Sequence, residues 1–529
     1  MITNFNRTVQ ALASERDPAM VRKILAQPGM SALDRAINYF SPTWGARRAL
    51  RRQVLAYATQ YRGAGSTTLR PDWIGFGDHD NSTPGGHELG TLRSRSRDAT
   101  RNDPVAAGAH DTLKNNIVGS GLKPQSRIPY KLFNISEERA SMLELQAEAA
   151  FERFKPFAAA DNRLTFDELQ FLALGKIIED GETIVIPTWA SESWRPYGRC
   201  LEIHESGRLG QPSAVSSPNK NVKNGIRFGD RGQPLGYFIR QAGSPTEFKE
   251  IAARDKNGRP RILHIFPTKR PGQQRGIPFF APVLTYFKDM SDYLEAELVA
   301  ARVAACLAVF ITKEDQFGPT GLESSTAGDT VHELAPGLIS RLGMGESISV
   351  VDPKRPGDSF GDFITSLLRL IGTALGLPYE LLVKDFSKTN YSSARASLLE
   401  GRRMFKNYRS WFAAKFCQPV WEMVIEEAYL RGEFDAPDFY EHQFEYTRAT
   451  WIGGGWGWVD PVKEVEASRK AIDYGLSTLA QEVAAQGGDW EETLDQLARE
   501  QAAVNEREID IYHAGKNTED KTNAETEED

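Results

Sequence analysis

The chain has 529 residues, a formal net charge of −7, 40% hydrophobic residues and 26% charged residues, which is an ordinary composition for a folded protein of several domains. Its longest apolar run, residues 303–311, is far shorter than the roughly 20 residues of a membrane span, and no signal peptide is evident. The three widely spaced cysteines, Cys200, Cys306 and Cys417, argue against a disulfide framework or a zinc site.

The two ends of the chain carry opposite charge. Residues 1–65 contain ten Lys/Arg and three Asp/Glu, a local net of +7, and their pattern predicts a basic helical arm. The last fourteen residues contain six acids and two lysines, a local net of −4, and residues 514–529 are expected to be disordered. The basic arm has two interpretations that the sequence leaves open, contact with nucleic acid or an acidic partner and a merely solvated helical face.

The first half of the chain is expected to pass from helices to strands. Residues 66–90, rich in Gly, Ser, Thr, Asp and Pro, indicate a loop, and a helix is predicted over 91–120. Further helical patterns occupy 135–180, including 166–178. Short apolar segments separated by Gly, Pro and Asn turns then predict strands at 182–189, 200–205, 225–229, 235–240 and 261–266.

A long helix is predicted from Pro282 to Ala305, because apolar residues recur there at helical spacing and proline suits a first turn. Its second half is rich in alanine, and such small side chains allow another helix to approach closely. The alanines expected at this contact are Ala296, Ala300, Ala301 and Ala304. A small strand-rich module follows at about 306–352, with a Gly/Ser/Thr loop inside it.

Two further helices flank a polar loop. Apolar residues recur at three- and four-residue spacing from Phe360 to Leu375, which predicts a helix that the following Gly376 ends. A second helical pattern starts near Ser393, and Pro419 is expected to kink or break it. Beyond residue 460, short helices are expected with Ser477 and Asp489 as caps.

The polar loop between these helices contains the candidate functional residues. Phe386 and Tyr391 are expected to pin its two ends, and the polar side chains between them are unsuited to a core. The candidate residues of the loop are Lys384, Asp385, Ser387, Lys388, Thr389 and Asn390.

The sharpest enzyme-like pattern is the G-x-S-x-G of residues 357–361, which in a serine hydrolase would place Ser359 on a nucleophile elbow. No strand is predicted directly before it, and nothing around His442 or His513 indicates a catalytic loop. Ser359 as a helix cap is therefore the preferred interpretation. No P-loop, H-E-x-x-H or G-x-G-x-x-G pattern is present.

Two other motifs receive structural interpretations. Asp180 and Glu182 flank a glycine without the spacing of a metal loop or an acid pair, so a turn before a strand is expected. Trp451, Trp456 and Trp458 lie among glycines and could stack on bases, although anchoring a loop in a core is the favoured role.

Several of these segments, in order, resemble the lambda-like portal protein family of tailed bacteriophages. The central matches are PGDSF at 356–360, LGLPYELL at 375–382 and NYSSARAS at 390–397. Collinear matches extend the resemblance over about residues 40–505. They are RDA at 97–99, RNDP at 101–104, NNIVG at 115–119, DGE at 180–182, ILHIF at 262–266, RG at 275–276, WIG at 451–453 and DPVKE at 460–464.

The resemblance implies an α+β, multi-domain portal fold of wing, stem, clip and crown in a cyclic ring of twelve copies. The implied parts are a basic arm at 1–65, the wing at 66–280, the first stem helix at 281–305, the clip at 306–357, the second stem helix at 358–376, the tunnel loop with its supporting helix and the return to the wing at 377–460, crown helices at 461–513 and an acidic tail at 514–529. Lys354 and Arg355 would lie near the stem–clip junction.

The implied function is that of a non-enzymatic channel for DNA at one capsid vertex, assembled in the host cytoplasm and retained in the virion, with no cofactor and no membrane. Lys384 and Lys388 would form rings that contact phosphates without reading bases. The implied partners are further copies of the chain, double-stranded DNA, terminase, the major capsid or scaffolding protein and head-completion proteins. Two alternatives stay open, a serine hydrolase using Ser359 and a structural capsid or tail component without a DNA channel.

Overall fold

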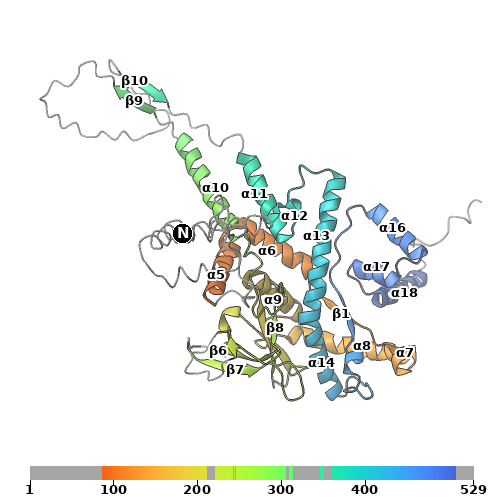
Figure 1. The fold of residues 1–529 in the computed structure, drawn as a ribbon. Coiled ribbons are helices and arrows are strands. Elements are labelled where there is room, and N and C mark those ends of the chain that lie inside the picture. The colour runs from red at the N-terminus through yellow and green to blue at the C-terminus, as the bar shows by residue number, and fades with distance from the viewer. Residues whose placement is uncertain are drawn as a thin grey trace, which may run out of the picture. The chain divides into compact units, whose positions relative to one another are not determined.

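The computed structural model describes residues 86–210, 221–241, 243–244, 246–305, 309–313, 346–350 and 360–507, all within one unit, Ser82–Asp529 (Figure 1). The unit mixes helices and strands, as the expected α+β class requires. The expected basic arm at 1–65, most of the expected clip and the acidic tail lie outside the described residues. No helix of the described part is long and apolar enough to cross a membrane.

The helix predicted over 91–120 is in fact two helices, α5 (Gly86–Asn102) and α6 (Pro104–Ile117). Asp103 separates them because its carboxylate accepts hydrogen bonds from the backbone N–H groups of Val105 and Ala106, at 2.9 and 2.8 Å. Pro104 stands at the first helical position, where its missing N–H has no cost.

Three helices and two sheets follow. The helices are α7 (Tyr130–Phe133), α8 (Glu137–Phe154) and α9 (Phe166–Asp180), and Gly181 ends α9 with a φ of 89°. The three-stranded antiparallel sheet has the order β3 (Arg199–His204), β2 (Thr183–Trp189), β8 (Leu263–Ile265). The four-stranded sheet has the order β4 (Val222–Lys223), β5 (Ile226–Phe228), β6 (Pro234–Arg240), β7 (Phe248–Ala252). All five predicted strands are confirmed, and β4 and β7 are additional.

The predicted long helices are confirmed as α10 (Leu284–Ala305) and α11 (Phe360–Leu375). They contact each other through Tyr293, whose ring lies 5.7 Å from that of Phe360 and 5.2 Å from that of Phe363. Between them in sequence, β9 (Val309–Lys313) and β10 (Glu346–Val350) pair as an antiparallel ribbon.

The supporting helix runs further than predicted. After α12 (Tyr379–Val383), α13 spans Tyr391–Phe412 and passes through the π-helical segment η3 (Ala413–Cys417) into α14 (Gln418–Leu430). Pro419 stands in the first turn of α14, and the chain stays helical through it, so the predicted break does not occur. A π-helical turn directly before it changes the hydrogen-bond register.

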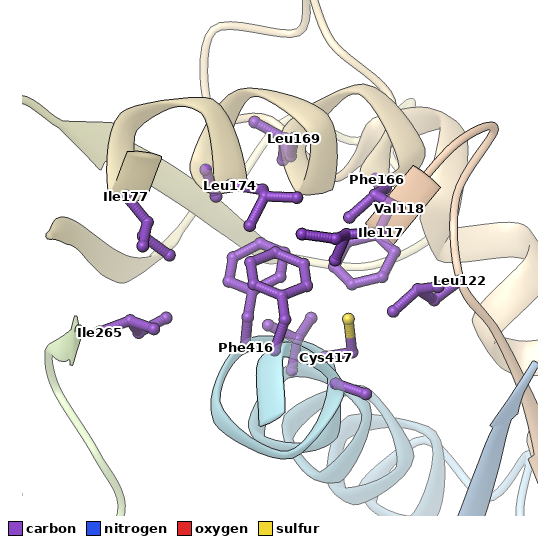
Figure 2. Close-up of a cluster of buried hydrophobic side chains, with 14 of the residues drawn as sticks. Ile117, Val118, Leu122, Phe166, Leu169, Leu174, Ile177, Ile265, Phe416 and Cys417 are labelled. Atoms are coloured by element: carbon purple, nitrogen blue, oxygen red, sulfur yellow. The ribbon is translucent and has the colours of Figure 1, made fainter. Parts of the chain in front are cut away.

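The core lies where η3 meets α6 and α9 (Figure 2). The ring of Phe416 stacks on that of Phe166 at 5.6 Å and on that of Phe412 at 5.2 Å. Further along the same helix, Trp421 packs edge-on against Phe151 at 5.2 Å. All five side chains are fully buried, so this junction fixes the supporting helix against the body.

The chain ends in short helices joined to the body by a strand. After α15 (Gln443–Tyr446), β11 (Ala449–Ile452) pairs with β1 (Lys123–Ser126). Then come α16 (Pro461–Asp473), α17 (Leu479–Ala485) and α18 (Trp490–Glu506). Asp489 caps α18 as predicted, whereas the cap of α17 is Thr478 rather than Ser477, since Thr478 forms a capping box with Gln481.

Candidate functional site

The candidate loop between α12 and α13 is a compact polar turn held by its own hydrogen bonds. The carboxylate of Asp385 accepts from the backbone N–H of Ser387 at 2.9 Å, and the Thr389 hydroxyl donates to the Phe386 carbonyl at 2.9 Å. Hydrogen bonds from the side chain and the backbone N–H of Ser387, together with the nearby Lys388, hold the pKa of Asp385 below its usual value.

The far end of the loop is fixed by a helix cap. The side-chain oxygen of Asn390 accepts from the backbone N–H of Ser393 at 2.8 Å, which satisfies one of the unpaired donors at the start of α13. The helix therefore starts at Tyr391, two residues before the predicted start at Ser393.

The loop leaves its two lysines accessible. Lys384, Ser387, Lys388 and Asn390 are exposed, and no acid among the described residues forms an ion pair within 4 Å of either lysine. Lys384 ends α12 with a φ of 59°, a left-handed conformation that is uncommon outside glycine. The geometry thus brings the predicted loop residues together and presents two free ammonium groups.

The base beneath the loop is rigid. Leu377 and Leu382 are buried, and Gly376 turns the chain between α11 and α12 with a φ of 68°. Gly401 of α13 lies against Leu381, because an added Cβ there would stand 2.4 Å from the leucine Cδ1. The missing side chain at Gly401 lets α13 approach α12 closely, and a Cβ there would require the Leu381 side chain to move.

Neither of the two aromatic residues expected to pin the loop is buried, since Phe386 is 41% exposed and Tyr391 is 48% exposed. Tyr391 does contact α16 at the surface, where its hydroxyl lies 3.5 Å from a carboxylate oxygen of Asp460 and Lys463 lies over its ring at 5.7 Å. The prediction of an apolar anchor is therefore wrong at both ends. The turn's own hydrogen bonds replace an apolar anchor.

The alanines of α10 are accessible in the single chain. Ala296 is exposed, Ala300 and Ala301 are half-buried, and the side chain of Ala304 lies outside the described residues. Lys354 and Arg355, expected near the stem–clip junction, also lie outside the described residues, as does Ser359.

Two of the three tryptophans in the glycine-rich segment anchor it to the body, which was the favoured interpretation. Trp451 donates from its indole N–H to Gln418 at 3.1 Å, and Trp456 packs beneath the guanidinium of Arg409 at 4.4 Å. Trp458 is 44% exposed. His442, once a candidate for a triad, packs edge-on against the ring of Phe133 at 5.1 Å.

A buried charge cluster around Glu182 was missed by sequence analysis, which expected only a turn. Arg93 donates to the Glu182 carboxylate at 2.7 Å, and Arg275 donates to it through Nε at 2.8 Å and Nη2 at 2.5 Å. His264 lies 2.9 Å away and the backbone N–H of Gly276 donates at 2.7 Å. Glu182 has no exposed surface, so the carboxylate is fully enclosed by donors.

These donors decide the ionisation of Glu182. Burial alone would raise its pKa, but Arg275, His264 and Arg93 together hold the pKa well below the usual range of a glutamate. Beside it, Arg97 donates twice to the fully buried Asp180, at 2.7 and 2.6 Å.

The cluster joins segments that are far apart in sequence. It connects α5, the corner between α9 and β2, the strand β8 and the segment before α10. Because every oxygen of Glu182 is engaged, the carboxylate has the properties of a structural joint rather than of a catalytic base. Among the described residues, no group of three or more His, Cys, Asp or Glu side chains could hold a metal ion.

Comparison with known proteins gives consistent matches. The model of a family described as "Phage portal protein, lambda family" matches residues 75–409. The portal protein of Escherichia phage N15 is 28% identical over 442 residues, covering 77% of this chain and 83% of that protein. Portal protein B of Escherichia phage lambda is 27% identical over 452 residues, covering 77% and 82%. A probable portal protein of Halomonas phage phiHAP-1 is 24% identical over 458 residues, covering 83% and 86%.

Similar solved structures come from gene transfer agent (GTA) particles. A chain from the neck of a native particle, computed with C12 symmetry, has a TM-score of 0.41 and 14% identity, covering 76% of this chain and 94% of that one. A chain from the neck of an empty particle, computed with C6 symmetry, has a TM-score of 0.41 and 13% identity, covering 77% and 95%.

Proposed function

Because the chain belongs to the lambda family of phage portal proteins, we propose that its loop at Lys384–Asn390 is the tunnel loop of a closed ring and faces a DNA channel. The observation that carries this proposal is the pair of exposed, unpaired lysines on a rigid base. In a ring each lysine is repeated once per subunit. Two rings of ammonium groups would then contact passing phosphates, independently of sequence and with strong salt dependence.

The ring itself is part of the proposal. Twelve copies would assemble through the alanine-rich half of α10, where half-buried Ala300 and Ala301 leave room for a neighbouring helix in a heterologous contact that closes. Replacing Ala300 and Ala304 by Leu should disturb the ring by overpacking, and electron microscopy or analytical ultracentrifugation would detect the change. A parent protein that stayed monomeric or dimeric at every concentration and salt would contradict the ring.

The roles that the ring would serve follow from the family. We propose a non-enzymatic component of the virion at one capsid vertex, which nucleates head assembly, docks terminase, conducts double-stranded DNA during packaging and ejection, and binds head-completion proteins. Labelling of Ser359 by a fluorophosphonate probe would instead support the alternative of a serine hydrolase.

The channel assignment is tested by the double variant K384A/K388A. Assembly should be unchanged, because neither lysine forms an ion pair within 4 Å among the described residues, while DNA packaging or retention should become less effective and less sensitive to salt. The matched control is K249A/K256A, which removes two other exposed lysines, one from the edge strand β7 and one from the turn after it. If the loop variant and the control both behaved like the parent at every salt concentration, the loop lysines would be ordinary solvated charges.

A further inference from the structure

The C-terminal helices α16–α18 are attached to the body without burying a side chain of their own. No residue of the three helices is buried. The linker before them passes close to the turn before α18, since an added Cβ on Gly455 would stand 2.5 Å from the Gln486 carbonyl oxygen. Arg402 of α13 donates to the Gly457 carbonyl at 2.7 Å. Such a unit can separate from the body at low cost in apolar burial.

A direct contact between α18 and the body is made by acidic side chains. Gln125 of β1 donates from its side-chain amide to the carboxylate of Asp489, the residue that caps α18. Behind this contact, Glu148 of α8 accepts from the Ser126 N–H at 2.7 Å, and Glu144 accepts from the Ile128 N–H at 2.6 Å.

The charges at this contact are unbalanced. The groups that act on Glu148 are Glu144 on its own helix and Asp489 and Glu491 on α18, all of which are acids. Arg127, directly after β1, is a nearby cation that offsets part of the charge on Glu144 and Glu491, and its Nη2 also donates to the Gln125 side-chain oxygen at 2.6 Å.

Two uncharged polar groups beside the acids also lack partners. The Ser126 hydroxyl and the Trp490 indole N–H are both buried without a hydrogen bond. Ser126 is the residue whose backbone N–H binds Glu148, and Trp490 lies between Asp489 and Glu491 in sequence. The contact therefore has more negative than positive charge and leaves two neutral polar groups without hydrogen bonds. The cluster at Glu182 differs, because donors enclose its carboxylate.

Burial and, to a lesser degree, the carboxylates of Asp489, Glu144 and Glu491 raise the pKa of Glu148 to about 7, although the hydrogen bond from Ser126 lowers it. Burial also raises the pKa of Glu144 and of Glu491. The protonation state of this contact thus changes near neutral pH.

We propose that Glu144, Glu148, Asp489 and Glu491 form a proton-controlled contact that holds α18 on β1 and α8 when Glu148 is protonated and releases it when Glu148 ionises. The contact lies within a single chain, so the proposal depends neither on a ring nor on DNA.

The sign follows from linkage. Release of α18 would remove Asp489 and Glu491, which raise the pKa of Glu148, so the open contact should bind the proton less tightly; closure is then favoured at lower pH and is weakened as the pH rises through about 7. If the open state has the ordinary glutamate pKa, the ratio of open to closed chains rises up to about tenfold between pH 6 and pH 8.

Hydrogen exchange of the full chain at pH 6 and pH 8, corrected for intrinsic rates, tests this proposal. Amides within α18 should exchange several-fold, up to about tenfold, faster at pH 8, while those of α9 should not change. E148Q keeps the size of the side chain and removes its charge, so α18 should then be equally protected at both pH values. The control is E152Q, one turn further along α8, where the exposed Glu152 pairs with Lys155 at 3.2 Å.

The control variant should retain the pH response of the parent. A second variant, D489N, removes a charge from the opposite side and should reduce the response without abolishing it. The proposal is overturned if α18 exchanges equally at both pH values in the parent, if α9 and α18 change together, or if E148Q responds to pH as the parent does.

Discussion

Two regions of this molecule use charge in opposite ways. Around Glu182, two arginines, a histidine and a backbone amide enclose one carboxylate that has no exposed surface. In the loop at Lys384–Asn390, two lysines project into solvent without an ion pair among the described residues. The first arrangement fixes a position, and the second is available to a partner. Breaking the first should therefore affect stability, whereas changing the second should affect function alone.

The largest expected effect is that of Glu182→Ala. It leaves Arg93 and Arg275 buried without their carboxylate, which should lower the free energy of unfolding by about 3–5 kcal/mol. Urea denaturation would measure it. The control is Asp435→Ala, which breaks an exposed ion pair with Arg139 of 2.6 Å and should cost about 0–1 kcal/mol. Equal losses for the two variants would show that the cluster is not a joint.

The same carboxylate predicts a pH dependence. Because the pKa of Glu182 is lower in the folded protein than in the unfolded chain, its contribution is fully present above the ordinary glutamate pKa and is lost as the pH falls through the folded value. Glu182→Gln should therefore be less stable than the parent at pH 7, and the difference should narrow steadily below about pH 4.5. Unfolding midpoints measured across this range would show whether the two curves converge.

Next in size is Gly376→Ala, at the base of the loop. Its φ of 68° disfavours any side chain, and an added Cβ would stand 2.9 Å from the Met404 sulfur, so we expect a loss of about 1–2 kcal/mol. Gly361→Ala is the matched control, because nothing lies within 4 Å of its added Cβ and its helical position favours alanine. Thermal unfolding should separate the two, and a stabilised Gly376→Ala would contradict the rigid base.

Asn390→Ala should have a smaller effect, about 1 kcal/mol, because it removes the cap of α13. Ser392→Ala, two residues further along, removes an exposed hydroxyl without a hydrogen bond among the described residues and should be neutral. Denaturant midpoints would compare the pair. No difference between them would mean that the loop, and not the cap, sets the start of the helix.

The smallest effect on stability is expected for K384A/K388A, within about 0.5 kcal/mol of the parent, since surface changes away from partners are usually neutral. If this variant keeps the unfolding midpoint of the parent and still loses DNA retention, the loop lysines act in function and not in stability. A destabilisation of several kcal/mol would place these lysines among the structural charges.

The sequence predicted those helices and strands whose formation depends on neighbouring residues in the chain. The periodicity from Phe360 to Leu375 gave the right bounds for α11, and β2 covers the short apolar run of its segment. The start of α13 was missed by two residues because Asn390 was assigned to the loop and not to a cap. The loop residues lie together because they are consecutive, which needs no tertiary information.

The elements that were missed depend on distant partners. Arg93 lies 89 positions before Glu182 and Arg275 lies 93 positions after it, and no spacing rule relates them. The strand β1 contains Pro124 and polar residues, so it is defined only by its pairing with β11 more than 300 positions later. The motif at 180–182 did mark the place of the cluster, but a carboxylate beside a glycine gives no sign of what surrounds it.

The π-helical segment Ala413–Cys417 has a consequence for comparing this chain with its relatives. A π turn holds one residue more than an α turn, so it rotates the following helix by about 100° relative to an uninterrupted one. The residue numbers that fall on one face of α13, which contains Arg409, therefore cannot be extended at a constant helical period into α14, which contains Trp421. A relative without this turn needs a one-residue gap here, or the residues of one half are aligned with positions about 100° away around the helix.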